Sequence, residues 1–160
     1  MGPVDGLLDE LTDESLRTAT LLGVASIPFT VALSWETFVR SWGGTPGDTV
    51  YLGGEITGWP VIFAALVAGY LYSDRPTESR SAGVRVGVVG ASPLLLSHVS
   101  NSAAVVLAGS LEMAVLVTLA TPVVVIVGAG LGGLVGYVAA ILGEKLAERM
   151  ASGRPDSAGE

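Results

Sequence analysis

The side chains best suited to chemistry gather in one short segment of the sequence. Hydroxyl, imidazole and amide groups occur together at Ser97, His98, Ser100, Asn101 and Ser102, within an otherwise apolar stretch. On a helix, His98 and Ser102 share one face, because residues four apart lie above one another. Polar groups on a lipid-covered helix are costly unless they face protein or water. We name His98, Asn101 and Ser102 the candidate polar path. These residues either conduct a small solute, or hydrogen-bond to another helix, or lie near the outer interface of the membrane.

The sequence lacks the residue types and spacings that enzymatic chemistry needs. The sequence contains no cysteine and one histidine, so it has no thiolate nucleophile and too few nitrogen and sulfur ligands for a metal site. A serine activated by His98 would need an acid to orient the imidazole, and none lies nearby in the sequence. We expect no catalytic residues, no cofactor-binding residues, no metal ligands and no enzyme activity.

A glycine-rich motif near the C-terminus has two interpretations. Residues 123–133 (VVVIVGAGLGG) combine a β-branched run with the G-x-G-x-x-G pattern of dinucleotide-binding proteins. That pattern needs a second strand and an acidic residue about 20 positions further on, whereas here an apolar stretch continues to Glu144. Gly128, Gly132 and Gly136 instead recur every four residues, and they predict a flat surface on one helix face that we call the glycine strip.

The glycine strip predicts close packing between two helices. Small residues four apart allow another helix to approach to backbone contact. Gly83 and Gly87 repeat this spacing earlier in the chain, so we expect the helix that carries them to pack against the glycine strip.

Composition places the chain among membrane proteins. Of its 160 residues, 50% are hydrophobic and only 14% are charged, and the mean hydropathy is +0.62. Ordinary soluble domains carry about 25% charged residues. The 22 glycines favour close contacts between apolar helices. A net charge of −7 without a basic patch argues against nucleic-acid binding.

Four apolar stretches predict an all-α membrane protein with four transmembrane helices. The helices are expected at residues 18–35, 56–73, 84–107 and 114–142. The first two stretches are uncharged for 18 residues each, close to the roughly 20 that cross a bilayer core about 30 Å thick. Residues 36–55 mix charges with glycines and predict a loop, and residues 74–85 predict a polar hinge between two helical hairpins.

The last two helices depend on where the chain reverses direction. Residues 86–143 contain a single charge, Glu112, and are too long for one span at about 1.5 Å rise per residue. A glycine, a serine and that charge coincide at residues 108–112, which favours a reversal there. A break at residues 97–102 would instead give five spans and place Glu112 within a membrane helix, at a cost of roughly 2.5 kcal/mol or more.

Basic residues predict the orientation in the membrane. With four spans, seven of the eight Lys and Arg residues fall on the side of both termini, and only Arg40 falls on the other. The positive-inside rule then predicts a multi-pass protein of the cell membrane with both termini in the cytoplasm. The expected organisation is an acidic cytoplasmic segment at residues 1–17, a four-helix domain at residues 18–146 and a polar tail at residues 147–160.

The middle of the chain resembles a family of small haloarchaeal membrane proteins. The similar residues are 67–76 (VAGYLYSDRP), 81–90 (SAGVRVGVVG) with Pro93, and 132–137 (GGLVGY). The resemblance spans residues 56–145, and the family is a domain of unknown function. It implies a four-helix unit in the haloarchaeal cell membrane and supplies no catalytic residues.

Two kinds of function fit these observations. The first is a structural or interaction role in the lipid bilayer, with helices packed through the glycine strip within one chain or between copies in a homo-oligomer. The alternative is a small transporter or channel subunit whose substrate, a small molecule or an ion, follows the candidate polar path. The length of the chain favours the first, because a lone four-helix bundle encloses little interior unless copies assemble.

Overall fold

The described part of the chain folds into α-helices, without strands. The computed structural model describes residues 16–43 and 56–152. The helices are α2 (Arg17–Leu33), α3 (Trp35–Gly43), α4 (Trp59–Leu71), α5 (Pro76–Gly90), α6 (Ser92–Ala108) and α7 (Leu111–Ser152). The all-α fold class is therefore confirmed for these residues.

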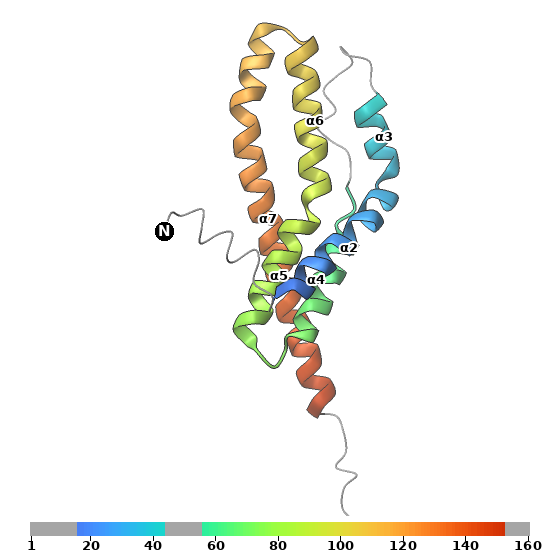
Figure 1. Cartoon of the computed structure of the whole chain (residues 1–160), viewed down its shortest axis with the longest axis vertical. Helices are drawn as coiled ribbons and strands as arrows, with labels where there is room; N and C mark the ends of the chain where they lie inside the picture. Colours follow the sequence, from blue (N-terminus) through green and yellow to red (C-terminus); the bar gives the residue numbers. More distant parts are fainter. Residues whose placement is uncertain (1–15, 44–55, 153–160) are drawn as a thin grey trace, which may run out of the picture.

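The helices run alternately up and down the long axis of the molecule. In Figure 1, α2 and α3 rise, α4 descends, α5 and α6 rise together, and α7 descends along the whole length. In the lower half, α4 and α5 pack against both α2 and α7, and in the upper half α6 and α7 form a hairpin with α3 beside α6. The hinge before α5 and the end of α7 consequently lie at one end of the molecule, and the α6–α7 turn lies at the other.

The chain reverses direction where the sequence favours it. α6 ends at Ala108 and α7 begins at Leu111, with Glu112 in its first turn. α6 continues without interruption through residues 97–102. The reversal at residues 108–112 is therefore confirmed, and the alternative with a break at residues 97–102 is wrong.

The predicted loop at residues 36–55 is wrong in its first part, because Trp35–Gly43 form α3. Trp35, Phe38 and Val39 fall on one apolar face at i, i+3 and i+4, and Phe38 is buried. The glycines that suggest a loop begin only at the last residue of this helix. The rest of the predicted loop lies outside the described residues, as do most of the acidic segment and the end of the polar tail.

The hinge between α4 and α5 is shorter than the predicted residues 74–85, because α5 begins at Pro76. Proline suits the first turn of a helix, since an N–H group there would have no partner within the helix. Arg75 and Glu78 form a salt bridge of 3.0 Å beside this helix start. The third apolar helix therefore begins before the predicted residue 84.

The junction at Ala91 between α5 and α6 is a feature that the sequence analysis does not predict. Pro93 has no N–H group to donate to the carbonyl of Val89, which breaks the helical hydrogen-bond pattern at this point. The pattern resumes at once, because the amide of Leu95 donates to the carbonyl of Ala91 at 3.2 Å. α5 and α6 therefore continue in the same direction as one long apolar rod (Figure 1).

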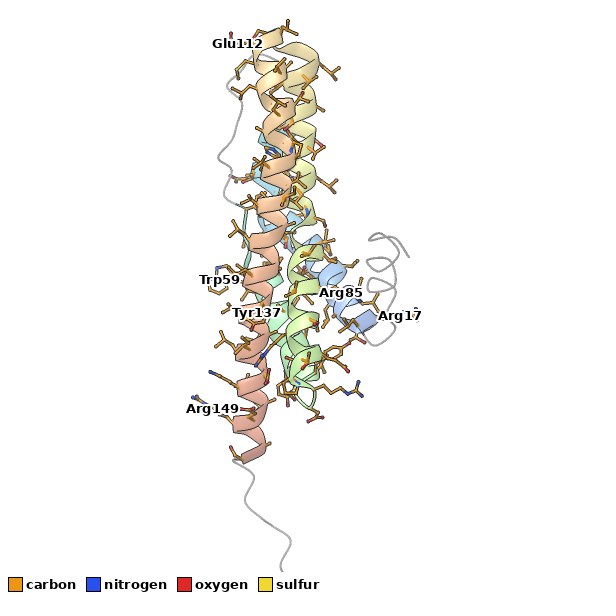
Figure 2. All side chains as sticks on the ribbon, turned by 90° about the vertical axis from the view of Figure 1, so that its left-hand side faces the viewer. Arg17, Trp59, Arg85, Glu112, Tyr137 and Arg149 are labelled. Atoms are coloured by element: carbon orange, nitrogen blue, oxygen red, sulfur yellow. The ribbon has the colours of Figure 1, made fainter. Side chains whose placement is uncertain are left out.

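The interior is built from small side chains, and the surface carries the large apolar ones. Ala65, Ala68 and Ala82 have no exposed surface, and Val86 is the largest apolar side chain that is fully buried among the described residues. Large apolar side chains point outward along the helices in Figure 2. The most exposed of them are Trp59, Leu107, Leu111, Leu119 and Ile126. A water-soluble helical bundle would have the opposite arrangement.

Two helical stretches are long and apolar enough to cross a membrane, Pro76–Leu107 and Leu111–Ser152. The helices α2 and α4 are also apolar but have only 17 and 13 residues. At 1.5 Å per residue, α4 is about 20 Å long, which is less than a hydrocarbon core of about 30 Å. Each predicted span thus coincides with helical structure, and two of the four predicted spans are long enough to cross the hydrocarbon core.

Candidate functional site

Four of the five predicted helix-packing glycines meet where α5 crosses α7. Gly83 and Gly87 on α5 face Gly132 and Gly136 on α7. A Cβ atom added at Gly136 would overlap the carbonyl oxygen of Gly83, and one at Gly132 would lie 2.8 Å from the carbonyl oxygen of Gly87. The two helix backbones are therefore in direct contact, and there is no space for a side chain between them.

The same packing continues from α7 to α4 through glycines outside the predicted set. A Cβ atom at Gly69 would overlap the backbone of Ala140, and one at Gly143 would overlap the carbonyl oxygen of Leu66. The four-residue spacing from Gly136 to Ala140 is the signal that could have extended the glycine strip this far. We call these contacts the glycine interface, which comprises Gly69, Gly83, Gly87, Gly132, Gly136 and Gly143.

Gly128, the upper member of the glycine strip, has looser surroundings. A Cβ atom there would meet the end of the Leu95 side chain of α6 at 3.0 Å. A side-chain end can move aside, whereas a backbone atom in a packed helix cannot. Gly130, on another face of α7, has open space around it. The constraint on α7 glycines is therefore strongest in the lower half, against α5 and α4.

In the candidate polar path, Ser102 connects two helices. The hydroxyl groups of Ser102 on α6 and Thr121 on α7 share a hydrogen bond of 3.0 Å. Thr121 also bonds to the carbonyl oxygen of Val117 on its own helix at 2.8 Å. Ser102 is buried, and its position matches the second role that the sequence leaves open, a hydrogen bond to another helix.

His98 is the member of the candidate polar path whose ring nitrogen Nε2 makes no hydrogen bond between helices. Its Nε2 atom is buried and has no hydrogen-bond partner. Because Leu95 packs at Gly128 and Ser102 at Thr121, the antiparallel register places His98 level with the apolar residues between those two positions of α7. A buried nitrogen without a partner is unfavourable, so His98 is the side chain for which a role beyond packing needs testing. Asn101, one turn of helix further on, is half-buried.

A row of buried hydroxyl groups on α2 is absent from the sequence predictions. Ser26 donates to the carbonyl oxygen of Gly23 at 2.7 Å, and Thr30 donates to that of Ser26 at 3.0 Å. The hydroxyl oxygen of Ser34 accepts a hydrogen bond of 2.9 Å from the backbone amide of Thr57. These groups are satisfied within the bundle. Ser34 in addition ties the non-helical residues before α4 to the end of α2.

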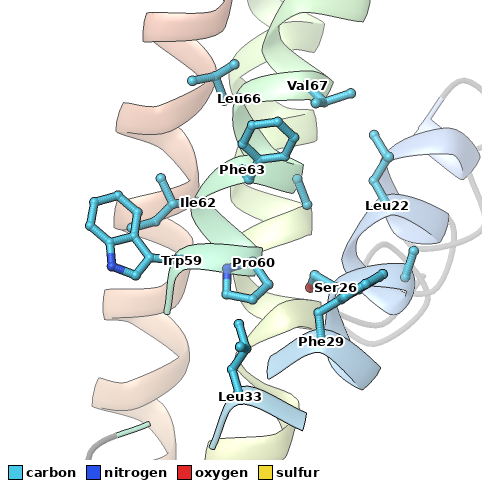
Figure 3. Close-up of a pocket in the computed structure, with 12 residues that line it drawn as sticks. Leu22, Ser26, Phe29, Leu33, Trp59, Pro60, Ile62, Phe63, Leu66 and Val67 are labelled. Atoms are coloured by element: carbon cyan, nitrogen blue, oxygen red, sulfur yellow. The ribbon is translucent and has the colours of Figure 1, made fainter. Parts of the chain in front are cut away.

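A groove of about 730 Å³ separates α2 from α4 (Figure 3). Phe29 and Phe63 lie on its two sides and Trp59 at one end (Figure 3), and all three are largely exposed. Ser26 supplies the one hydroxyl of the lining, and its proton goes to a carbonyl of its own helix. Apart from Ser26 and the indole N–H of Trp59, the groove has an apolar lining, which suits hydrocarbon chains.

Residues 16–43 and 56–152 contain no cluster of three His, Cys, Asp or Glu residues that could hold a metal ion. Comparison with known proteins adds no assignment, because no protein-family model, curated protein or solved structure matches the chain. The resemblance to a haloarchaeal family stays a prediction.

The Ser102–Thr121 hydrogen bond can be tested with a double-mutant cycle. We expect Ser102→Ala and Thr121→Val each to lower the free energy of unfolding, with a coupling energy of about 0.6 kcal/mol between them, typical of hydrogen bonds between membrane helices. Thr118→Val is the matched control, because Thr118 is exposed and bonds only to Ala114 of its own helix. Strictly additive effects of the two substitutions would show that the two hydroxyl groups do not stabilise the hairpin.

Proposed function

We propose that the chain is an integral membrane protein whose role is structural or interactive, built on helices packed through the glycine interface. The observation that carries this proposal is the surface of α7. None of the residues in its most apolar 18-residue window is buried, although α7 runs along the whole molecule. Monomeric soluble proteins rarely expose contiguous apolar patches of more than a few hundred Å². Lipid is the environment that this surface fits.

The proposal includes four passes through the membrane, and the alternating direction of the helices supports this number. The passes are α2 with α3, α4, α5 with α6, and α7. Non-helical backbone within a membrane is tolerated where protein satisfies its polar groups. The hydrogen bond from Thr57 to Ser34 does this immediately before the short helix α4. The proposal therefore accommodates a helix that is shorter than the bilayer core.

The proposed orientation places the lower end of the molecule in the cytoplasm. Arg17 and Arg149 lie in the lower half of the molecule in Figure 2, and the hinge at the lower end carries Arg75. Glu112 lies at the upper end (Figure 2), which has no basic residue in the α6–α7 turn. Positive charge on one side is the feature that orients multi-pass proteins. The protein would then reside in the cell membrane with both termini inside.

The outer surface of α7 is the surface available to a partner. The glycine interface is already occupied within one chain, so a second copy would have to use another face. Leu116, Val123, Val127 and Leu134 share the opposite face of α7 by helical periodicity, and all four are exposed. Lipid chains or a second copy of the chain can cover this face.

The alternative function, a small transporter or channel subunit, is favoured by one observation, the buried and unpartnered Nε2 atom of His98. Histidine is a common proton shuttle in proteins and therefore suits a proton path. Asn101 would be the second polar group of such a path, and the substrate would be a small molecule or an ion. Flux measurements separate the two functions.

We expect the purified protein to produce no proton or cation flux in lipid vesicles beyond that of protein-free vesicles. The reason is that Ser102 is bonded to Thr121 and the residues of α7 opposite His98 are apolar, so no continuous polar route crosses the hairpin. His98→Ala and Asn101→Leu should then alter stability and leave the flux at background, as should the control Val99→Ala. A pH-dependent conductance in the unmodified protein that His98→Ala abolishes would contradict the structural role and support the alternative.

A further inference from the structure

Arg85 is a charged side chain inside the bundle that lacks an anionic partner among the described residues. It lies on α5, is only 8% exposed, and has no hydrogen-bond partner at its Nη1 atom. The ion pair that the described residues contain joins Arg75 to Glu78 at the hinge. A guanidinium group does not lose its charge in a protein, so a buried one requires a compensating anion.

The position of Arg85 on α5 directs its side chain away from α7. It lies two residues from both Gly83 and Gly87, which contact α7. Two residues correspond to a rotation of about 200° on a helix of 3.6 residues per turn. Arg85 therefore lies on the flank of α5 that faces α2, beside Val86, which packs in one cluster with Leu16.

The guanidinium group of Arg85 reaches the level of the first turn of α2. The two helices run in the same direction, and Gly23 of α2 packs against Val86 and Val89 of α5. This register places the backbone of Arg85 about one turn above the start of α2. Side chains on a helix tilt toward its N-terminus, so a side chain as long as arginine covers that turn. Figure 2 shows Arg85 and Arg17 on the same side of the molecule and at nearly the same height.

The first turn of α2 is itself suited to an anion. No side chain caps the helix at Leu16, and its first turn contains no acidic residue. The helix dipole makes such an end electropositive. Arg17 adds an exposed guanidinium group at the same place. Two arginines therefore lie at the level of the N-terminus of α2, Arg17 as its first residue and Arg85 on the neighbouring helix.

We propose that Arg85, Arg17 and the N-terminus of α2 bind the phosphate group of an anionic lipid in the cytoplasmic leaflet. The inference rests on the proposed membrane location. Below Arg85, residues 76–81 of α5 are mostly polar (PTESRS), which places Arg85 where the bilayer core meets the headgroups. Arginine binds phosphate oxygens in a bidentate manner, and the cytoplasmic leaflet is rich in anionic lipids.

The test compares lipid binding by full-length variants in neutral detergent. Phosphatidylglycerol is titrated and bound lipid is counted by native mass spectrometry, with phosphatidylcholine as the neutral lipid. We expect Arg85→Gln to weaken phosphatidylglycerol binding about tenfold, as the loss of one charge-assisted hydrogen-bond pair does. Arg17→Gln should cause a smaller loss, and Arg85→Lys, which keeps the charge and removes the bidentate geometry, should lie between Arg85→Gln and the unmodified protein. Arg85→Lys also serves if Arg85→Gln fails to fold.

Arg80→Gln is the matched control, because Arg80 is an exposed arginine on the same helix. Equal losses in Arg80→Gln and Arg85→Gln, or no loss in Arg85→Gln and Arg85→Lys, would overturn the site. Competition by millimolar inorganic phosphate would reassign it to a free anion and overturn the lipid assignment. Tighter lipid binding after the double substitution Asp13→Asn and Glu14→Gln would show that carboxylates of the chain itself fill the site. A failed lipid site with the membrane topology intact would reject this inference alone.

Discussion

Replacing Gly136 with alanine is expected to lower the free energy of unfolding by about 3 kcal/mol, at the upper end of the range for overpacked cores. The added Cβ atom would overlap the carbonyl oxygen of Gly83, a backbone atom of the facing helix. The helices α5 and α7 would have to separate where Gly83 and Gly87 face Gly132 and Gly136 to accommodate one methyl group. The expected loss is measured as unfolding in a fixed detergent, with the helix content followed by circular dichroism.

Gly130→Ala is the matched control for this substitution. It makes the same chemical change on the same helix, but a Cβ atom at Gly130 has open space around it. Alanine stabilises a helix interior over glycine by about 1 kcal/mol, so the control should be neutral or slightly stabilising. Equal destabilisation by both substitutions would show that the contact with the facing helix does not determine the effect, because Gly130 has no such contact. Gly136→Ala with unchanged stability would contradict the glycine interface directly.

The sequence predicts the helices and the chain reversal because both depend on local composition. Long uncharged runs can only be apolar helices in this chain, and the coincidence of glycine, serine and Glu112 leaves one good place for a turn. The helix α3 is not predicted in this way, because it is short and amphipathic and because the glycines that follow it indicate a loop. The early start of α5 is not predicted either. The helix begins at Pro76, and its first residues are too polar for a membrane span.

The sequence predicts the part of the candidate site that depends on residue spacing within a single helix. The spacing of Gly132 and Gly136 identifies a packing face, but the contacts of Gly69 and Gly143 depend on how α4 crosses α7. The spacing from Gly136 to Ala140 extends the packing face on α7, but it does not say which helix crosses there, because the crossing position is a property of the assembled bundle. Arg85 shows the same limit, because its charge is visible in the sequence as an orientation signal, whereas its burial results from α2 packing on α5.

The second large effect concerns membrane topology and can be measured because the chain contains no cysteine. Single cysteines can therefore be introduced into an otherwise unreactive background. We choose Asp74→Cys at the hinge, Ser110→Cys at the α6–α7 turn and Ser152→Cys at the end of α7, all three positions lying outside apolar helix interiors. Leu134→Cys, on the outer face of α7, is the control for a lipid-covered position.

Labelling of these variants in intact cells with a membrane-impermeant maleimide tests the central claim, a four-pass bundle with α5–α6 and α7 as full membrane crossings. We expect that Ser110→Cys reacts from outside, that Asp74→Cys and Ser152→Cys react only after permeabilisation, and that Leu134→Cys stays unreactive under both conditions. Reaction of Asp74→Cys and Ser110→Cys from the same side of the membrane would contradict the four-pass bundle, because the helical rod between these two positions would then not cross the bilayer.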